Sequence, residues 1–465
     1  MNAIKEKKFE CILFISYLAY VITFSFYHEP WRDEAQAWLI AKCDSLYEIL
    51  FVTPHYEGHP SLWYLILFPF AKLGMNYEVS LKFVNIAISS IAVLLILFRF
   101  DIPKIVKFLI VTNRSVLCQI SLVCRPYCLV LLAFVILALN FPERREKPIP
   151  FFISIMFLCM THMICLMLAG IISFIYMLET IKDKTFKKKL KLFILLFLYA
   201  VIILLQIFPA SDQQFANDPE INRFGTQKIY LFFNFINYAL TSLHIENIIA
   251  ILVAYFLINI SLCKLFKENG KYYIFPLLGF SLFYTLIYIQ YHLSSIVVSL
   301  VIFNLLISKY EVNTQKTGLY IVIMIMAVWY LCVDIYMGRY EKLYDYGAGR
   351  AIASYIKENN LEDKVIFVDY YPDGCTDCYS LNPYFNENNI IDNLNMDNRN
   401  KGYMIWRDTA LDIKKIHEIG SPDVFITEDI ENLKTVFNFD NIDEYTKEKE
   451  IETIRGEVYY IYVKE

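Results

Sequence analysis

The sequence predicts a polytopic α-helical membrane protein that ends in a small α/β domain outside the membrane. Of its 465 residues, 57% are hydrophobic and only 19% are charged, which is too apolar for a soluble chain of this length. Several apolar runs approach the roughly 20 residues that a helix needs to cross a bilayer. From Gly338 onward polar residues become more frequent, so we divide the chain into a membrane domain, 1–337, and an α/β domain, 338–465.

The first predicted span, residues 9–26, sets the orientation. Lys5, Lys7 and Lys8 precede it, and the positive-inside tendency then places the N-terminus in the cytoplasm. The run has no small-residue cleavage site and leads directly into a charged loop, 27–60, so we interpret it as a span and not as a cleaved signal. The loop is therefore expected on the outer face of a plasma membrane.

The same rule places the later segments. Two tightly joined helices are expected between residues 150 and 180, a partial or re-entrant piece at 103–124 and an interfacial helix at 228–243. Full spans are expected at 61–78, 80–100, 126–141, 190–209, 245–265, 272–290, 293–309 and 317–336. These segments give about 11 spans, or about 13 if the pieces at 103–124 and 228–243 also cross the membrane. The lysines between 182 and 191 mark the cytoplasmic side, and the C-terminal domain lies outside on either count. This arrangement also leaves Arg99, Lys104 and Lys107 outside, against the rule.

The loop 27–60 concentrates ionisable and aromatic residues. Ionisable groups at a membrane interface are expensive to hold there and indicate a functional site. The loop opens with His28-Glu29-Pro30-Trp31-Arg32-Asp33-Glu34 and closes with Tyr56-Glu57-Gly58-His59-Pro60. Pro30 and Asp33 suit a helix start. Asp33 can then cap that helix and complement its dipole, or it can face away from the tryptophan side of the helix and act in chemistry.

Glu57 and His59 form the second candidate group, with His55 nearby. A carboxylate and an imidazole two residues apart can share a divalent metal, which in turn can bind a phosphate. Two or three ligands alone do not make a closed site, so the alternative is a polar loop without any ligand.

Arg125 stands alone in strongly apolar sequence, directly before Pro126 and Tyr127. A guanidinium in such a place needs an anion, and a lipid-linked phosphate is one candidate; the alternative is that Arg125 extends to the lipid headgroups. His162 and His292 are expected near the outer face. Each can be a phosphate ligand or an interfacial histidine with an ordinary hydrogen bond.

The C-terminal part alternates strands with helices, which is typical of a small α/β domain. Strands are expected at 365–370, 403–406, 423–427 and 458–463, and helices at 349–359, 409–418 and 430–437. The segment has no Gly-rich phosphate loop and no nucleophile elbow. Cys375 and Cys378 form either a disulfide or two unrelated thiols, because no second pair or histidine cluster indicates zinc. The other cysteines fall in or beside apolar runs, where they are small buried hydrophobes.

The pattern of these motifs resembles the GT-C superfamily of membrane glycosyltransferases, which includes protein O-mannosyltransferases and the aminoarabinose transferases of lipid A. The likeness covers roughly residues 10–310. It rests on an inside N-terminus and on four motifs, namely Trp31–Trp38, Glu57–Pro60, Arg125–Tyr127 and Thr161–His162. The chain departs from relatives that carry an acidic motif in the second external loop, because no Asp or Glu lies around Arg125.

The resemblance implies a GT-C-like enzyme that moves a sugar from a polyprenyl-phosphate donor to a glycan, lipid or protein acceptor. Asp33 and Glu34 then lie at the catalytic centre, with Asp33 as general base, and Glu57 binds metal or donor. Arg32, Arg125, Tyr127, His162 and His292 are candidates for donor and phosphate binding. A transporter or flippase of lipid-linked sugars and an assembly scaffold are the rival classes. The net charge of -4 does not suggest a nucleic-acid partner.

Overall fold

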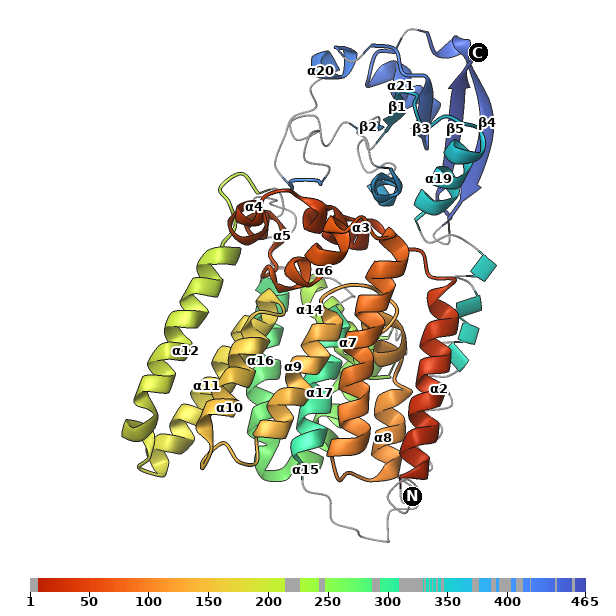
Figure 1. Ribbon diagram of the computed structural model, residues 1–465. Coiled ribbons are helices and arrows are strands. Elements are labelled where there is room, and N and C mark those ends of the chain that lie inside the picture. The colour runs from red at the N-terminus through yellow and green to blue at the C-terminus, as the bar shows by residue number, and fades with distance from the viewer. Residues whose placement is uncertain are drawn as a thin grey trace.

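The structure is a computed structural model. It describes residues 7–213, 226–241, 247–286, 293–308, 347–369, 376–385, 390–392, 403–406, 413–418, 420–439, 441–453 and 456–465, together with isolated positions between 329 and 343. The described part is a bundle of helices with a small mixed sheet at one end, and the N-terminus lies at the other end (Figure 1).

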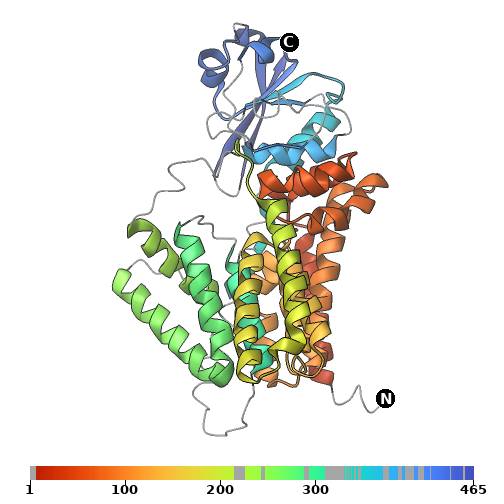
Figure 2. The ribbon, with the colours of Figure 1, turned by 90° about the vertical axis from the view of Figure 1, so that its left-hand side faces the viewer.

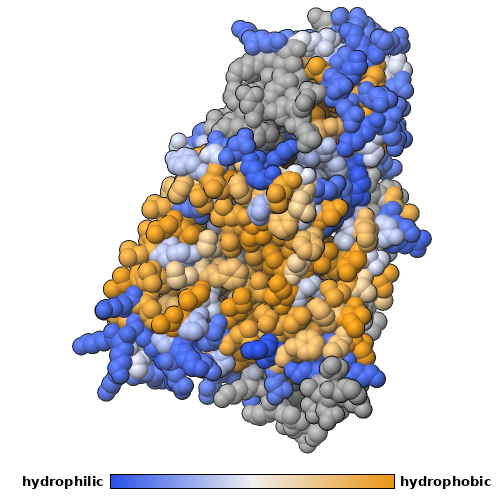
Figure 3. All heavy atoms as spheres, viewed as in Figure 1, coloured by the Kyte–Doolittle hydropathy of each residue, from blue (hydrophilic) through white to orange (hydrophobic). Residues whose placement is uncertain are grey.

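The bundle contains helices long and apolar enough to cross a membrane. Within the described residues there are five such stretches, namely Lys8–Ser25, Tyr77–Arg99, Met163–Lys182, Phe186–Ile207 and Ile248–Phe283. Their outward side chains are large and apolar, as at Phe197 and Ile202 of the fourth stretch. Figure 3 shows this apolar surface covering the bundle between polar ends. An apolar surface of this extent is typical of a chain that contacts lipid.

Four short helices lie together at the end of the bundle that carries the sheet (Figures 1 and 2). They are α3 (Arg32–Lys42), α4 (Leu46–Phe51), α5 (Pro54–Glu57) and α6 (Leu62–Lys72). The span expected at 61–78 is therefore wrong, because α6 has only 11 residues and ends at Lys72. A new helix, α7 (Tyr77–Arg99), begins after it.

As a result, α7 runs toward the N-terminal end of the bundle, where it meets α2 (Lys8–Ser25). The Lys7 ammonium donates to the carbonyl oxygen of Phe98 (2.9 Å). The Lys107 ammonium lies 2.8 Å from a carboxylate oxygen of Glu10. Arg99, Lys104 and Lys107, which the sequence placed on the outer side, thus lie at the same end of the bundle as Lys7 and Lys8.

Residues 104–124 return from that end to the sheet-bearing end as α8 (Lys104–Val111) and a π-helix, η1 (Ser115–Ile120). The partial or re-entrant piece expected here is also wrong. The wide turns of η1 leave carbonyl oxygens for other donors, and Asn85 Nδ2 donates to those of Ile120 (3.2 Å) and Ser121 (2.9 Å). One segment expected to run the length of the bundle does not, and one expected not to does. The number of passes before Arg125 is therefore unchanged, and Arg125 lies at the expected end of the bundle.

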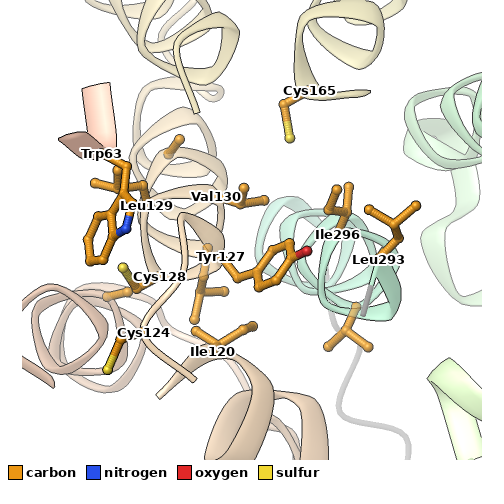
Figure 4. Close-up of a cluster of buried hydrophobic side chains, with 14 of the residues drawn as sticks. Trp63, Ile120, Cys124, Tyr127, Cys128, Leu129, Val130, Cys165, Leu293 and Ile296 are labelled. Atoms are coloured by element: carbon orange, nitrogen blue, oxygen red, sulfur yellow. The ribbon is translucent and has the colours of Figure 1, made fainter. Parts of the chain in front are cut away.

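The remaining described helices begin and end close to the expected segments, but the helices at 126–141 and 293–309 have only 14 residues each, fewer than the full spans expected there. A hairpin of α10 (Pro148–Cys159) and α11 (Met163–Lys182) turns at His162, as expected. The others are α9 (Tyr127–Asn140), α12 (Phe186–Ile207), α14 (Thr226–Thr241), α15 (Ile248–Phe266), α16 (Lys271–Leu286) and α17 (Ser294–Ile307). In the core, α9 packs against both η1 and α17, and Tyr127 is directed toward Ile296 (Figure 4).

The C-terminal domain is a five-stranded mixed sheet in the order β2-β1-β3-β5-β4. Its strands are β1 (Ile366–Val368), β2 (Ile390–Asp392), β3 (Val424–Thr427), β4 (Tyr445–Glu452) and β5 (Val458–Lys464), and its helices include α19 (Gly349–Glu358), α20 (Ile413–His417) and α21 (Ile430–Thr435). Three expected strands are confirmed, but 403–406 is not a strand, and β2 and β4 were not predicted.

Charged groups that are buried or partly buried hold this domain to the bundle. The Arg350 guanidinium of α19 donates to both carboxylate oxygens of Glu78 at the start of α7 (2.9 and 2.8 Å). The buried Glu29 carboxylate accepts from the backbone N–H groups of Gly347 (3.1 Å) and Arg350 (2.5 Å). A carboxylate at the N-terminus of α19 also complements the helix dipole. The loop 27–60 is thereby fixed between the bundle and the domain.

Candidate active site

Glu34 caps the helix on which the site is built. Its Oε2 accepts from the backbone N–H of Trp31 (3.1 Å), and its Oε1 accepts from the backbone N–H of Cys124 (2.6 Å). His28 Nε2 lies 3.1 Å from Oε2, and the Glu34 side chain is fully buried. Glu34 therefore ties the start of α3 to the chain just before Arg125, which is a positioning task.

Asp33 is directed elsewhere and does not make the cap. Its Oδ2 lies 2.7 Å from Nη1 of Arg125, and its Oδ1 lies 3.3 Å from Nε of Arg32. The Asp33 side chain keeps 21% of its surface exposed, against 9% for Arg125. A carboxylate held by two cations at this exposure is fixed in orientation and remains accessible to a small ligand.

Arg125 is a buried, paired cation. Besides Asp33, its guanidinium reaches Nε2 of His59 (3.4 Å). Its central carbon lies 5.8 Å from the Trp31 ring and 5.6 Å from the Tyr127 ring, within the range of cation–π attraction. This geometry differs from that of an arginine extended to lipid headgroups, because the charge is directed into the protein.

His59 and Tyr127 contact the same guanidinium, and the His162 ring packs against both of them. The His59 and His162 rings are 4.5 Å apart, and the Tyr127 and His162 rings are 6.1 Å apart. Burial, followed by the charge of Arg125, lowers the pKa of His59 to about 3, so this imidazole is neutral at pH 7. Since a guanidinium only donates, Nε2 of His59 accepts and Nδ1 carries the proton. That buried Nδ1 has no hydrogen-bond partner among the described residues.

Glu57 lies beside this group and has different hydrogen-bond partners. Burial raises the pKa of Glu57 to about 7, an effect that the Asp33 charge reinforces and a hydrogen bond from Gln36 opposes. The Gln36 Nε2 group donates to Glu57 Oε1 (2.7 Å) and also to the carbonyl oxygen of Met404 (2.6 Å). The Trp406 side chain also hydrogen-bonds Glu57. Sequence reasoning missed Gln36, Met404 and Trp406.

The donor set does not fit a divalent metal in this arrangement. The described residues contain no group of three His, Cys, Asp or Glu side chains that could hold a metal ion. Of the two ligands suggested by the sequence, His59 directs its accepting nitrogen at a cationic guanidinium and Glu57 is bonded to Gln36. A second cation beside Arg125 would be repelled.

Some sequence candidates lie elsewhere. His55 Nδ1 lies 2.5 Å from the carbonyl oxygen of Phe208, which fastens α5 to the end of α12 and not to the Asp33 group. His292 and Cys375 lie outside the described residues, as does most of the span expected at 317–336. The described candidates Arg32, Asp33, Glu57, His59, Arg125, Tyr127 and His162 form one connected group.

Comparison of the chain with models of protein families, with curated proteins and with solved structures finds no match in any of the three. The geometry of this group and the motifs of the loop 27–60 are therefore the features that indicate a function.

Proposed function

We propose that the protein is an integral-membrane glycosyltransferase of the GT-C type. It transfers a sugar from a polyprenyl-phosphate donor to a hydroxyl of an envelope acceptor, with inversion at the anomeric carbon. The observation that carries the proposal is the pair of Asp33 and Arg125, 2.7 Å apart at the sheet-bearing end of an apolar bundle. It brings a candidate base and a candidate phosphate ligand into one place.

The reaction divides its tasks between these two groups. Asp33 accepts the proton of the acceptor hydroxyl as its oxygen forms a bond to the anomeric carbon. The bond from that carbon to the phosphate oxygen breaks, and polyprenyl phosphate leaves. Arg125 and Arg32 stabilise the negative charge that develops on the leaving phosphate. Direct displacement inverts the anomeric carbon.

The surroundings of the pair support this division. His59 is neutral and presents a buried Nδ1–H group without a described partner, which suits an oxygen of a phosphate or a sugar. The apolar bundle below the pair suits a polyprenyl chain. Lys7, Lys8 and the lysines after α11 lie at the opposite end, which under the positive-inside tendency makes that end cytoplasmic and the site extracytoplasmic.

Release of polyprenyl phosphate tests the proposal. The purified protein is incubated in detergent with a panel of polyprenyl-phosphate hexoses and pentoses and with envelope extract as acceptor. We expect at least one donor to release polyprenyl phosphate only when the extract is present. Movement of intact lipid-linked sugar across proteoliposome membranes, without such release, would instead establish the rival class of flippases.

A further inference from the structure

The segment Tyr403–Trp406 leaves the C-terminal domain and lies on the loop that carries the site. Its first three residues are buried. The Gln36 side chain recognises the backbone of Met404 twice, because Gln36 Oε1 accepts from the Met404 N–H (3.0 Å) and Gln36 Nε2 donates to the Met404 carbonyl (2.6 Å). The Tyr403 hydroxyl donates to Glu48 Oε2 (3.1 Å). The segment is therefore anchored to both α3 and α4.

Trp406 follows these anchors and contacts the charged residues themselves. The Arg32 guanidinium lies 5.3 Å from the Trp406 ring centre, and Arg32 pairs with Asp33. The Trp406 side chain also hydrogen-bonds Glu57. The indole N–H is the only donor of that side chain, so one tryptophan orients a cation through its ring and a carboxylate through its nitrogen.

We propose that Trp406 is a positioning residue of the transferase site, so that the C-terminal domain completes this site. The inference rests on the proposed function. Trp406 fixes Arg32 beside Asp33 and fixes the Glu57 carboxylate, so that both face the sugar and phosphate of the donor. Aromatic surface combined with a few oriented polar groups is the usual composition of a small-molecule site. Displacement of such groups by about 1 Å can lower a rate by roughly a hundredfold.

Two variants of the same segment separate positioning from simple attachment of the domain. Trp406→Phe keeps a ring over Arg32 but removes the donor to Glu57. Tyr403→Phe is the matched control, because it removes the hydrogen bond of a neighbouring side chain to Glu48, which lies outside the connected group. We expect Trp406→Phe to lower the transfer rate by about 10–100-fold and Tyr403→Phe to leave it near the parent rate. Trp406→Ala should lower the rate further, because it also removes the ring.

Tryptophan emission supplies a readout that attachment alone does not change. On titration with polyprenyl phosphate in detergent, Arg32 should move relative to the Trp406 ring and alter its emission. We expect Trp406→Phe to lose a large part of this change and Trp38→Phe, which alters a buried tryptophan packed on Tyr77, to keep it. Rates and emission changes that are equal in Trp406→Phe, Tyr403→Phe and the parent would overturn the inference and leave the proposed function standing. A parent that does not bind polyprenyl phosphate would overturn both.

Discussion

Substitution of Asp33 by Asn should slow transfer and tighten phosphate binding at the same time. Asn keeps the volume of the side chain and removes the basic carboxylate, which typically lowers a rate by about 10²–10⁴-fold. It also removes the counter-ion that occupies Arg125 at 2.7 Å. A polyprenyl phosphate then no longer competes with Asp33 for the guanidinium. Arg125→Met should have the opposite effect on binding.

The structure sets the size of these effects. At an effective dielectric constant of about 20, a pair of charges roughly 4 Å apart interacts by about 4 kcal/mol. Because Arg32 shares Asp33 and the carboxylate is partly exposed, we expect only about 1–2 kcal/mol of this to appear, which is roughly a tenfold tighter Kd. The same change leaves a buried cation less well paired, so thermal stability should fall.

The assay compares transfer rate, the Kd of polyprenyl phosphate and melting temperature in detergent for the parent, Asp33→Asn and a matched control. Asp44→Asn is that control, since it removes a carboxylate paired with a lysine (Lys72, 2.6 Å) on the exposed surface. Weaker binding by Asp33→Asn would refute the competition between phosphate and carboxylate. A transfer rate within about threefold of the parent, well below the loss expected without a base, would refute Asp33 as the base.

Three further predictions concern topology, pH and packing. In a cysteine-free background, Ser211→Cys should react with an impermeant maleimide in intact cells and Lys187→Cys should not; labelling at position 187 would reverse the orientation. Because the folded protein holds a proton on Glu57 up to about pH 7 that the unfolded chain loses near 4.5, the melting temperature should fall as pH rises through this window, and Glu57→Gln should flatten the dependence. Gly349→Ala should destabilise the C-terminal domain by about 1–3 kcal/mol, since its Cβ would lie 2.8–2.9 Å from the backbone of residues 380 and 381; a melting temperature equal to that of the parent would contradict this.

The sequence located most helices because apolar length and basic flanks reflect physical requirements of crossing a bilayer. It failed at 61–78, where apolar length alone suggested a span. The stop signals were present in the chain: Gly74 adopts a left-handed conformation (φ +65°), and the Asn76 side chain caps α7 by accepting from the Val79 N–H (3.1 Å). Turn chemistry therefore outweighed hydropathy at this position.

The site was predictable only in part, for a related reason. Asp33, Glu57 and Arg125 could be named because ionisable residues are rare in apolar surroundings. The pairing of Gln36 with Met404 could not, since it joins positions 368 residues apart and uses backbone N–H and C=O groups that every residue type except proline possesses. The different roles of Asp33 and Glu34 could also be assigned only from the structure. Adjacent acidic residues look alike in a sequence, but one pairs with Arg125 and the other caps the helix.

The π-helix η1 makes the position of Arg125 sensitive to chain length. A π-turn contains one more residue than the α-turn it replaces, and deletion of a residue between Ser115 and Ile120 would allow the segment to tighten into an α-helix. Each residue of an α-helix advances about 100° around its axis, so the deletion would rotate whatever follows. It would also withdraw the carbonyl oxygens that Asn85 holds. The segment Ser115–Ile120 itself carries no charged side chain. Insertions and deletions in it nevertheless change the direction of the Arg125 guanidinium more than most substitutions next to Arg125 would.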